Sequence, residues 1–284
     1  MDEHRITVMT DSTCDIPPEL ARELGIRVVP LYVLFGDEHL RDGIDVDSDG
    51  FYARLSADPE HPKSSQPTPA DFQSVIEASG SSEVVCIHIS NRLSGTIASA
   101  TAAQELVSAS TRVHVVDSMS VSMGLGLQVL AAARARNAGG SVEEIIAAAE
   151  RARNTLQVVF TVDTLEYLHR GGRIGAAAKL LGTALQLKPV LAIPTASGQI
   201  EAVERVRSRR RSLARLVEYS LEQIDTSRPI RAAVMQGVCP DDAHWVLGEL
   251  TARADVAEAI YTNVTPVVGT HGGPGVLGIA LCHA

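Results

Sequence analysis

The stretch "EVVCIHISNRLSGTIASATAAQELV" (residues 83–107) decides the architecture. Its first part, "EVVCIHIS", is an apolar run of strand length, and the part from "SGT" onward has the polar start and spacing of a helix. The link from Ser90 to Thr96 holds small polar side chains around Gly95. Such residues build turns, and the free amides at a helix start attract anions. The link is therefore interpreted as a turn and as a candidate anion site.

Further strand–helix units lie on both sides of this stretch. "RITVMT" (5–10) precedes "PPELARELG" (17–25), and "TRVHVVDS" (111–118) precedes "GLGLQVLAAARARNAG" (124–139). This alternation predicts a parallel, doubly wound sheet. The strands are rich in Val and Ile throughout, as expected when helices cover both faces.

The pattern changes after the amphipathic helix "SVEEIIAAAERARNT" (141–155). Strands then predominate: "LQVVFTVDT", "KPVLAIPT", "QIEAVERVR", "RAAVMQG", "AEAIYTNVT" and "GVLGIALCH". The short turn "ASG" (196–198) is a hairpin signal. We predict an N-terminal α/β domain over residues 1–153 and a C-terminal α+β domain with a mixed or antiparallel sheet over residues 154–284.

Composition and charge exclude some classes of function. The chain has 284 residues, a net charge of −9 and only 4% aromatic residues, which argues against a nucleic-acid partner. No segment approaches the ~20 apolar residues of a membrane helix. The start "MDEHRITVMTDS" has no long apolar run, and the four cysteines are scattered without a metal-ligand spacing. We expect a cytoplasmic protein without stable membrane insertion.

Three segments end predicted strands with polar side chains, namely residues 11–13, 90–96 and 117–118. The carboxyl ends of parallel strands meet at one sheet edge, where ligands bind in doubly wound folds. Two glycine-rich segments, "LHRGGRIG" around Arg173 and "GTHGGPGVLG" around His271, add a guanidinium and an imidazole. Each is open to a purely structural interpretation when taken alone.

Other motifs point away from metal and nucleotide sites. "DVDSDG" (45–50) imitates the start of an EF-hand loop, but Ser56 stands where the closing carboxylate belongs. We interpret it as a capped start of the next helix and expect no metal. No GxxxxGK[ST] loop occurs, so we expect no nucleotide cofactor. Ser94, His271 and Asp117 could form a hydrolase triad, although no GxSxG elbow presents the serine.

The order of seven motifs carries more information than any one of them. They are "TDSTCDIPPEL", "SSQPTPADF", "ISNRLSGT", "VVDSMSVSMGLG", "TLEYLHRGGRI", "LKPVL" and "GTHGGPGVLG". Together, from Asp11 to Gly278, they resemble the DegV family of fatty-acid-binding proteins. The resemblance implies two α/β domains with one long-chain fatty acid, such as palmitate, between them. It also implies a carboxylate held by hydroxyl groups and an acyl chain in an apolar tunnel.

Motif matching carries the family's binding residues onto this chain. The family's threonine and serine before Gln-Pro fall on Ser64 and Ser65, so this chain departs at Ser64, where the methyl group is lost. The remaining matches are Ser94 with Gly95 and Thr96, the arginine Arg173 and the histidine His271. Ser94 and Gly95 are expected at a helix N-terminus, where hydroxyls and amides can hold an anion.

The resemblance also implies a partner, because family members present fatty acids to a separate fatty acid kinase. The basic segment "RVRSRRRSLAR" (205–215) matches a basic segment of the family, and we hypothesise a kinase-docking face there. Its arginines are Arg205, Arg207, Arg209, Arg210 and Arg211. "AAAKLLGTALQL" (176–187) is a candidate tunnel wall. The alternative from another class of function is a Ser/His-dependent acyl esterase or thioesterase.

Overall fold

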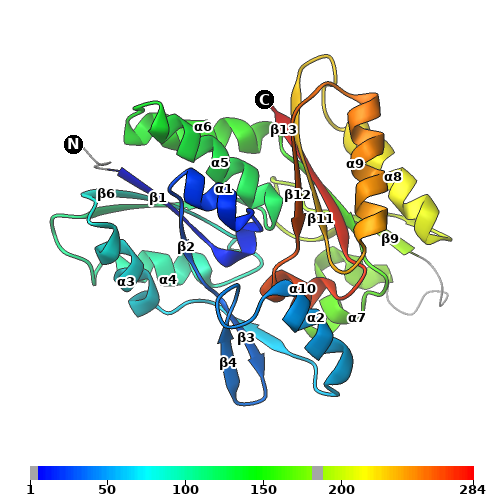
Figure 1. Ribbon diagram of the computed structural model, residues 1–284, viewed down its shortest axis with the longest axis horizontal. Helices are drawn as coiled ribbons and strands as arrows, with labels where there is room; N and C mark the ends of the chain where they lie inside the picture. The colour runs from blue at the N-terminus through cyan, green and yellow to red at the C-terminus, as the bar shows by residue number, and fades with distance from the viewer. Residues whose placement is uncertain (1–5, 181–187) are drawn as a thin grey trace.

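The computed structural model describes residues 6–180 and 188–284 and contains three sheets (Figure 1). The N-terminal sheet is entirely parallel, in the order β2-β1-β6-β7. Its strands are β1 (Ile6–Asp11), β2 (Arg27–Val29), β6 (Glu83–His88) and β7 (Arg112–Asp117). Between β1 and β2 lie the short 3₁₀ helix η1 (Ser12–Cys14) and α1 (Pro18–Glu23).

Helices cover both faces of this sheet. Met9 and Cys86 pack with α3 (Pro69–Ser79) and α4 (Thr96–Ala103), whereas Val8 and Val85 pack with α5 (Met123–Asn137). Successive side chains of a strand point to opposite faces, so covering both faces requires apolar residues at every position. The predicted doubly wound, parallel sheet is confirmed.

The C-terminal sheet has six strands in the order β10-β9-β8-β13-β11-β12. Only β11 and β12 pair in parallel, so the sheet is mixed, as predicted. Its strands are β8 (Gln157–Thr161), β9 (Lys188–Ala192), β10 (Glu201–Val206), β11 (Ile230–Gln236), β12 (Val256–Asn263) and β13 (Leu277–His283). The helices α8 (Arg209–Glu222) and α9 (Pro240–Arg253) cover its outer face (Figure 1).

Helix α5 joins the two larger sheets into one core. It packs beside α6 (Val142–Thr155) and contacts β1 and β6 on one side and β11 and β13 on the other. Met123, Leu127 and Leu130 are at most 1% exposed. A helix that is apolar on all sides is stable only when it is buried on all sides. The domain division at residues 153 and 154 therefore stays a prediction, since one apolar cluster runs from β1 through α5 to β11.

The third sheet is small and antiparallel, and it was not predicted. It consists of β3 (Tyr32–Phe35), β4 (Glu38–Arg41) and β5 (Lys63–Ser65), and it packs with α2 (Ser48–Ala57) against α10 (Pro266–Gly272). The strands have at most four residues, and β4, "EHLR", is mostly exposed, so periodicity could not indicate it. This sheet sets β5 beside α10, and α7 (Glu166–Arg170) packs against α10 as well.

The acidic segment before α2 is a helix start, as predicted. The carboxylate of Asp47 accepts a hydrogen bond of 2.8 Å from the amide of Gly50. Asp45 is instead paired with Arg41, with its Oδ1 2.8 Å from Nη2 of the arginine. Capping by an aspartate satisfies an amide that the first helical turn leaves without a partner.

Two buried carboxyl groups connect the N-terminal segments with the start of α10. Asp15 Oδ1 accepts a hydrogen bond of 3.0 Å from the amide of Thr265, and Asp42 Oδ1 accepts one of 3.4 Å from the amide of Val267. Burial is the largest cause that raises the pKa of each carboxyl to about 7, and hydrogen bonds oppose it only in part. In the folded chain each carboxyl is therefore mainly protonated below about pH 7.

We predict that Asp42→Asn flattens the pH dependence of stability. A carboxyl whose folded-state pKa lies above its unfolded value contributes stability that is fully present below about pH 4 and lost as pH rises through about 7. The asparagine cannot lose a proton. As pH rises across this range, the free energy of unfolding of the variant should therefore increase by at least about 1 kcal/mol relative to that of the wild type. Urea unfolding at a series of pH values measures the difference. Asp37→Asn, at an exposed position, is the control, and equal pH slopes for wild type and Asp42→Asn would contradict the prediction.

Candidate functional site

A mainly apolar pocket lies where the carboxyl-end loops of the N-terminal sheet meet β5, α10 and the inner face of the C-terminal sheet. Its cavity holds about 100 Å³ in this structure. The apolar lining comes from every layer and consists of Leu31, Ile89, Leu93, Val121, Val158, Phe160, Leu168, Ile193, Ile200, Met235, Val264, Val267, Val268 and Val276. Such a lining favours an apolar ligand.

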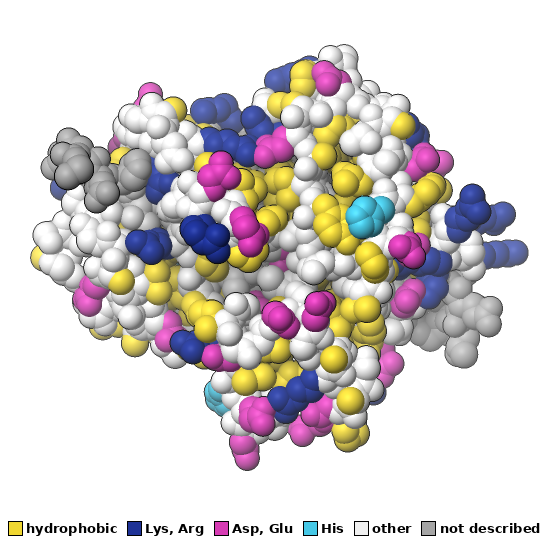
Figure 2. Space-filling model, viewed as in Figure 1, with side chains coloured by type: hydrophobic (Ala, Val, Ile, Leu, Met, Phe, Trp, Pro, Cys, Tyr) yellow, Lys and Arg dark blue, Asp and Glu magenta, His cyan; other side chains and the backbone are white. Residues whose placement is uncertain are grey.

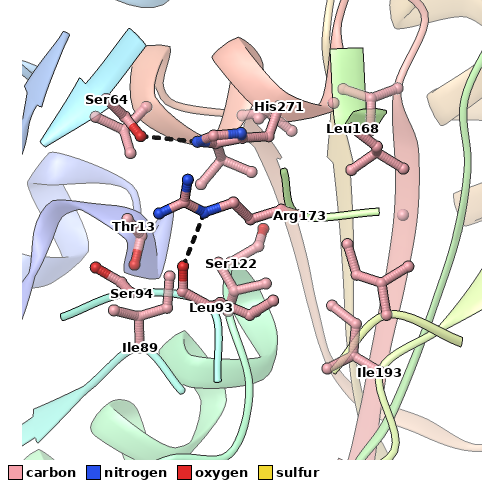
Figure 3. Close-up of a pocket in the computed structure, with 18 of the residues that line it drawn as sticks. Thr13, Ser64, Ile89, Leu93, Ser94, Ser122, Leu168, Arg173, Ile193 and His271 are labelled. Carbon is pink, nitrogen blue, oxygen red and sulfur yellow. Dashed lines mark hydrogen bonds between the residues drawn. The ribbon is translucent and has the colours of Figure 1, made fainter. Parts of the chain in front are cut away.

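Polar side chains gather at one part of this pocket. They are Thr13, Ser64, Ser65, Gln66, Ser94, Ser122, Arg173 and His271. Figure 3 shows the guanidinium of Arg173 between Ser64 and His271 on one side and Thr13 and Ser94 on the other. An apolar cavity with one polar, positively charged end suits an amphipathic anion.

His271 forms a hydrogen-bonded pair with Ser64, with 2.7 Å between Nε2 and the hydroxyl oxygen. Burial first, and then the nearby charge of Arg173, lowers the pKa of His271 to about 4. The ring is therefore neutral at neutral pH. Nδ1 of His271 is buried and has no partner among the described residues. An unpaired ring nitrogen costs less as an acceptor than as a donor, which favours the tautomer with the proton on Nε2. That tautomer leaves the Ser64 hydroxyl free to donate.

Arg173 is held by backbone carbonyls. Its Nε donates to Leu93 O at 3.0 Å, and its Nη1 donates to Gly171 O at 2.8 Å. Within the described chain Nη2 makes no hydrogen bond and the guanidinium pairs with no carboxylate. The preceding glycines allow this arrangement, because a Cβ at Gly171 would lie 2.0 Å from Nδ1 of His271.

The link from Ser90 to Thr96 positions Ser94. The Ser90 hydroxyl donates to Gly198 O at 2.8 Å and so ties the link to the turn between β9 and β10. Ser94 Oγ lies 2.8 Å from the hydroxyl of Thr96 and accepts from the Thr96 amide at 3.3 Å. Thr96 itself is fully buried. It therefore orients the Ser94 hydroxyl from behind.

Five of the predicted site residues line the pocket, namely Ser64, Ser65, Ser94, Arg173 and His271. Gly95 and Thr96 are outside the described lining. Gly95 is the N-cap of α4, and a Cβ there would lie 3.0 Å from Nε2 of Gln66, so its small size admits that side chain. The predicted roles of Gly95 and Thr96 in ligand binding stay predictions.

Thr13, Gln66 and Ser122 line the pocket but were not predicted to bind a ligand, although each lies in one of the seven motifs. Thr13 follows β1, and its hydroxyl donates to Asp11 at 2.5 Å, while Asp11 also contacts Nδ1 of buried His88 at 2.9 Å. The hydroxyl proton of Thr13 is thereby committed, and its lone pairs remain to accept. The polar residues after β1 were the signal in the sequence that could have indicated Thr13. The hydrogen-bond network of Asp11 with His88, which orients the Thr13 hydroxyl, depends on tertiary packing.

The hydrolase triad considered from the sequence is not assembled. His271 is bonded to Ser64 rather than Ser94. Asp117 accepts from the amides of Asn91 and Met119 at 3.3 and 2.8 Å and is outside the pocket lining. Within residues 6–180 and 188–284 the imidazole therefore has no carboxylate that would orient it.

In the basic segment, residues 205–215, one of the arginines proposed for kinase docking is paired with other residues of the chain. Arg205, Arg207, Arg210 and Arg211 are exposed. Arg209 is not a free cation: its Nε donates to Asp242 at 2.8 Å and its Nη1 to Gly275 O at 2.6 Å. Arg209 thus fastens the start of α8 to α9 and to the glycine-rich loop after α10.

Part of the candidate tunnel wall, residues 181–187, lies outside the described residues. The preceding residues form a short 3₁₀ helix, η2 (Gly175–Leu180), which contributes nothing to the described pocket lining. Among the helices that the structure describes, none is long and apolar enough to cross a bilayer.

Known proteins resemble this chain along nearly its whole length. The family described as "Uncharacterised protein, DegV family" matches residues 5–284. A DegV domain-containing protein of Deinococcus radiodurans is 38% identical, with 97% of this chain and 98% of that protein covered. Protein DegV of Bacillus subtilis is 34% identical, with 98% of this chain and 99% of that protein covered.

Solved structures show the same fold. A DegV family protein from Thermus thermophilus, described by its fatty acid binding, superimposes with a TM-score of 0.92 at 36% identity and covers 99% of this chain and 100% of its own. DegV from Bacillus subtilis, described as a fatty acid binding protein, has a TM-score of 0.88 at 33% identity and covers 98% and 99%. From its sequence and its fold alike, this chain belongs to the DegV family.

Proposed function

We propose that this protein binds one long-chain fatty acid such as palmitate. Its carboxylate would lie against Arg173 and the hydroxyls of Ser64 and Ser94, and its acyl chain would extend among the apolar side chains of the pocket. The observation that carries the proposal is a guanidinium without a carboxylate partner in the described chain, set at the polar end of an apolar pocket. The fatty acid binding described for related DegV proteins supports it.

The acyl chain would supply most of the affinity. Burying a sixteen-carbon chain at ~0.8 kcal/mol per CH₂ gives roughly 10 kcal/mol before association and ordering costs. The cavity of about 100 Å³ is smaller than the roughly 300–1,000 Å³ of common ligand pockets, so side chains must separate as the chain enters. The unbranched side chain of Met235 in the lining suits such a movement.

The polar end would set the orientation of the ligand. Ser64 donates a proton if His271 keeps its own on Nε2, and each hydrogen bond to a carboxylate adds ~1.5–3 kcal/mol. The amide of Gly95, at the start of α4, has no partner among the described residues and lies in the same loop as Ser94. Because His271 is neutral, it adds no second buried positive charge beside Arg173, and it still orients the Ser64 hydroxyl.

We further propose that the chain is a carrier that presents the carboxylate to a separate fatty acid kinase and performs no chemistry by itself. The exposed arginines Arg205, Arg207 and Arg210 would meet the kinase, with Arg209 shaping that surface from within. The Ser64–His271 pair favours one alternative, an acyl esterase. Its imidazole has no orienting carboxylate within the described residues, which weighs against that alternative.

Removing either hydroxyl should weaken binding of the acid selectively. We predict that Ser64→Ala and Ser94→Ala each raise the Kd for palmitate about tenfold or more, since each removes one hydrogen bond to a charged group. The affinity for methyl palmitate, which has no carboxylate, should change little. Titration calorimetry with both ligands measures this contrast.

Ser110→Ala, at an exposed loop position, is the matched control. If all three variants bound palmitate as tightly as the wild type, the proposed polar end would be wrong. Turnover of an activated acyl ester by the isolated wild type, lost in Ser64→Ala, would favour the esterase instead.

The docking surface can be tested separately. We predict that Arg207→Glu with Arg210→Glu lowers the rate of acyl phosphate formation by a fatty acid kinase at least about tenfold, because both charges reverse at an exposed surface. Palmitate affinity should remain unchanged. Lys63→Glu, an exposed reversal on β5, is the control, and an unaltered kinase rate in the double variant would refute this docking surface.

A further inference from the structure

A second cleft lies on the seam between the two larger sheets, away from the apolar pocket. Gly278 of β13 lines the pocket, whereas His283, at the other end of the same strand, lines the cleft. The two residues are five positions apart along the strand, which is about 17 Å. The cleft measures about 510 Å³, and its walls come from α5 and α6 on one side and from the ends of β11 and β13 on the other.

Four arginines line this cleft: Arg134, Arg151, Arg228 and Arg231. Figure 2 shows Lys and Arg side chains gathered in the hollow between the α5–α6 pair and the C-terminal end of β13. This concentration of positive charge is unusual because the whole chain has a net charge of −9. A cleft lined by one sign of charge concentrates ligands of the opposite sign.

The acidic groups nearby do not balance these arginines. Glu258 accepts from Arg134 Nη1 at 2.8 Å and lies 3.3 Å from Nε of Arg231. The carboxylate of Asp225 accepts a hydrogen bond of 2.7 Å from the Ser227 hydroxyl and acts electrostatically on Arg228 and His283. Glu258 and Asp225 thus carry two negative charges against the four arginines. Arg151 and Arg228 are exposed and form no ion pair or hydrogen bond within residues 6–180 and 188–284.

His283 adds a polar group that lacks a partner. Its Nε2 lies 3.1 Å from the carbonyl oxygen of Asp225, to which it donates. Its Nδ1 is buried and has no partner among the described residues, so it can accept a hydrogen bond from a ligand hydroxyl. A buried polar atom without a partner is costly, and a ligand or water at the cleft would remove that cost.

The remaining lining indicates that the ligand has an organic part. Ala131 and Ala135 are one turn apart on α5, and Ala148 and Ala152 are one turn apart on α6. These small side chains leave an apolar floor beside the arginines. The volume lies within the roughly 300–1,000 Å³ of small-molecule pockets and exceeds what a single phosphate group fills.

We infer that this cleft binds a phosphorylated organic molecule, with its phosphate groups on Arg151 and Arg228 and its apolar part on the alanine floor. Arginine suits phosphate because its planar fork donates two parallel hydrogen bonds. A bound phosphate would join α6 to the strand ends of the C-terminal sheet and so stabilise the fold. This site is independent of the proposed fatty acid site.

Titration calorimetry with ADP, inorganic pyrophosphate and adenosine tests the inference. We expect ADP to bind at least as tightly as pyrophosphate, with a Kd that rises with salt, and adenosine to give no binding. The double variant Arg151→Ala with Arg228→Ala should raise the Kd for ADP at least about tenfold while leaving palmitate affinity unchanged. ADP should also raise the Tm of the wild type but not that of the double variant.

Arg27→Ala, at an exposed position on β2, is the matched control and should bind ADP as the wild type does. Three results would overturn the inference: no binding of ADP or pyrophosphate to the wild type, equal affinities in the double variant, or binding to phosphatidate-containing vesicles without binding to the soluble probes. Tighter binding of pyrophosphate than of ADP would refute the role of the alanine floor.

Discussion

The proposed fatty acid site depends on one constraint, a guanidinium held in an apolar pocket with no carboxylate to neutralise it within the described chain. Arg173 is fixed by two backbone carbonyls, so it cannot swing out to a surface acid without losing both hydrogen bonds. A charge so placed stabilises an anion that brings its own apolar body. The neutral state of His271 follows from the same constraint, because burial and the nearby cation both oppose its protonation.

The fold supplies this arrangement from distant parts of the chain. The N-terminal sheet ends in loops that carry Thr13 and Ser94, the small third sheet carries Ser64, and α10 carries His271. Helix α5 packs against strands of both larger sheets. The pocket lies where these layers meet. The same packing contacts therefore stabilise the fold and would determine the affinity of the pocket for its proposed ligand.

The sequence predicted the elements that carry a strong period or a strong cap. The parallel sheet, the mixed sheet and the capping by Asp47 follow from local pattern, and the order of motifs identified the lining residues Ser64, Ser94 and Arg173. What the sequence could not show depends on contacts between distant segments. Two examples are the orientation of Ser94 by Thr96 and the hydrogen bond from Arg209 to Asp242 of α9. The third sheet was missed because its strands are short and partly polar.

The central claim is that the pocket takes a free fatty acid in the cell. Native mass spectrometry of freshly purified protein, followed by solvent extraction and analysis of the extract, tests it most directly. The account predicts an added mass on the intact protein that extracts as one equivalent of free long-chain acid and is lost on delipidation. Protein that carries no lipid and takes up none when incubated with palmitate would contradict it.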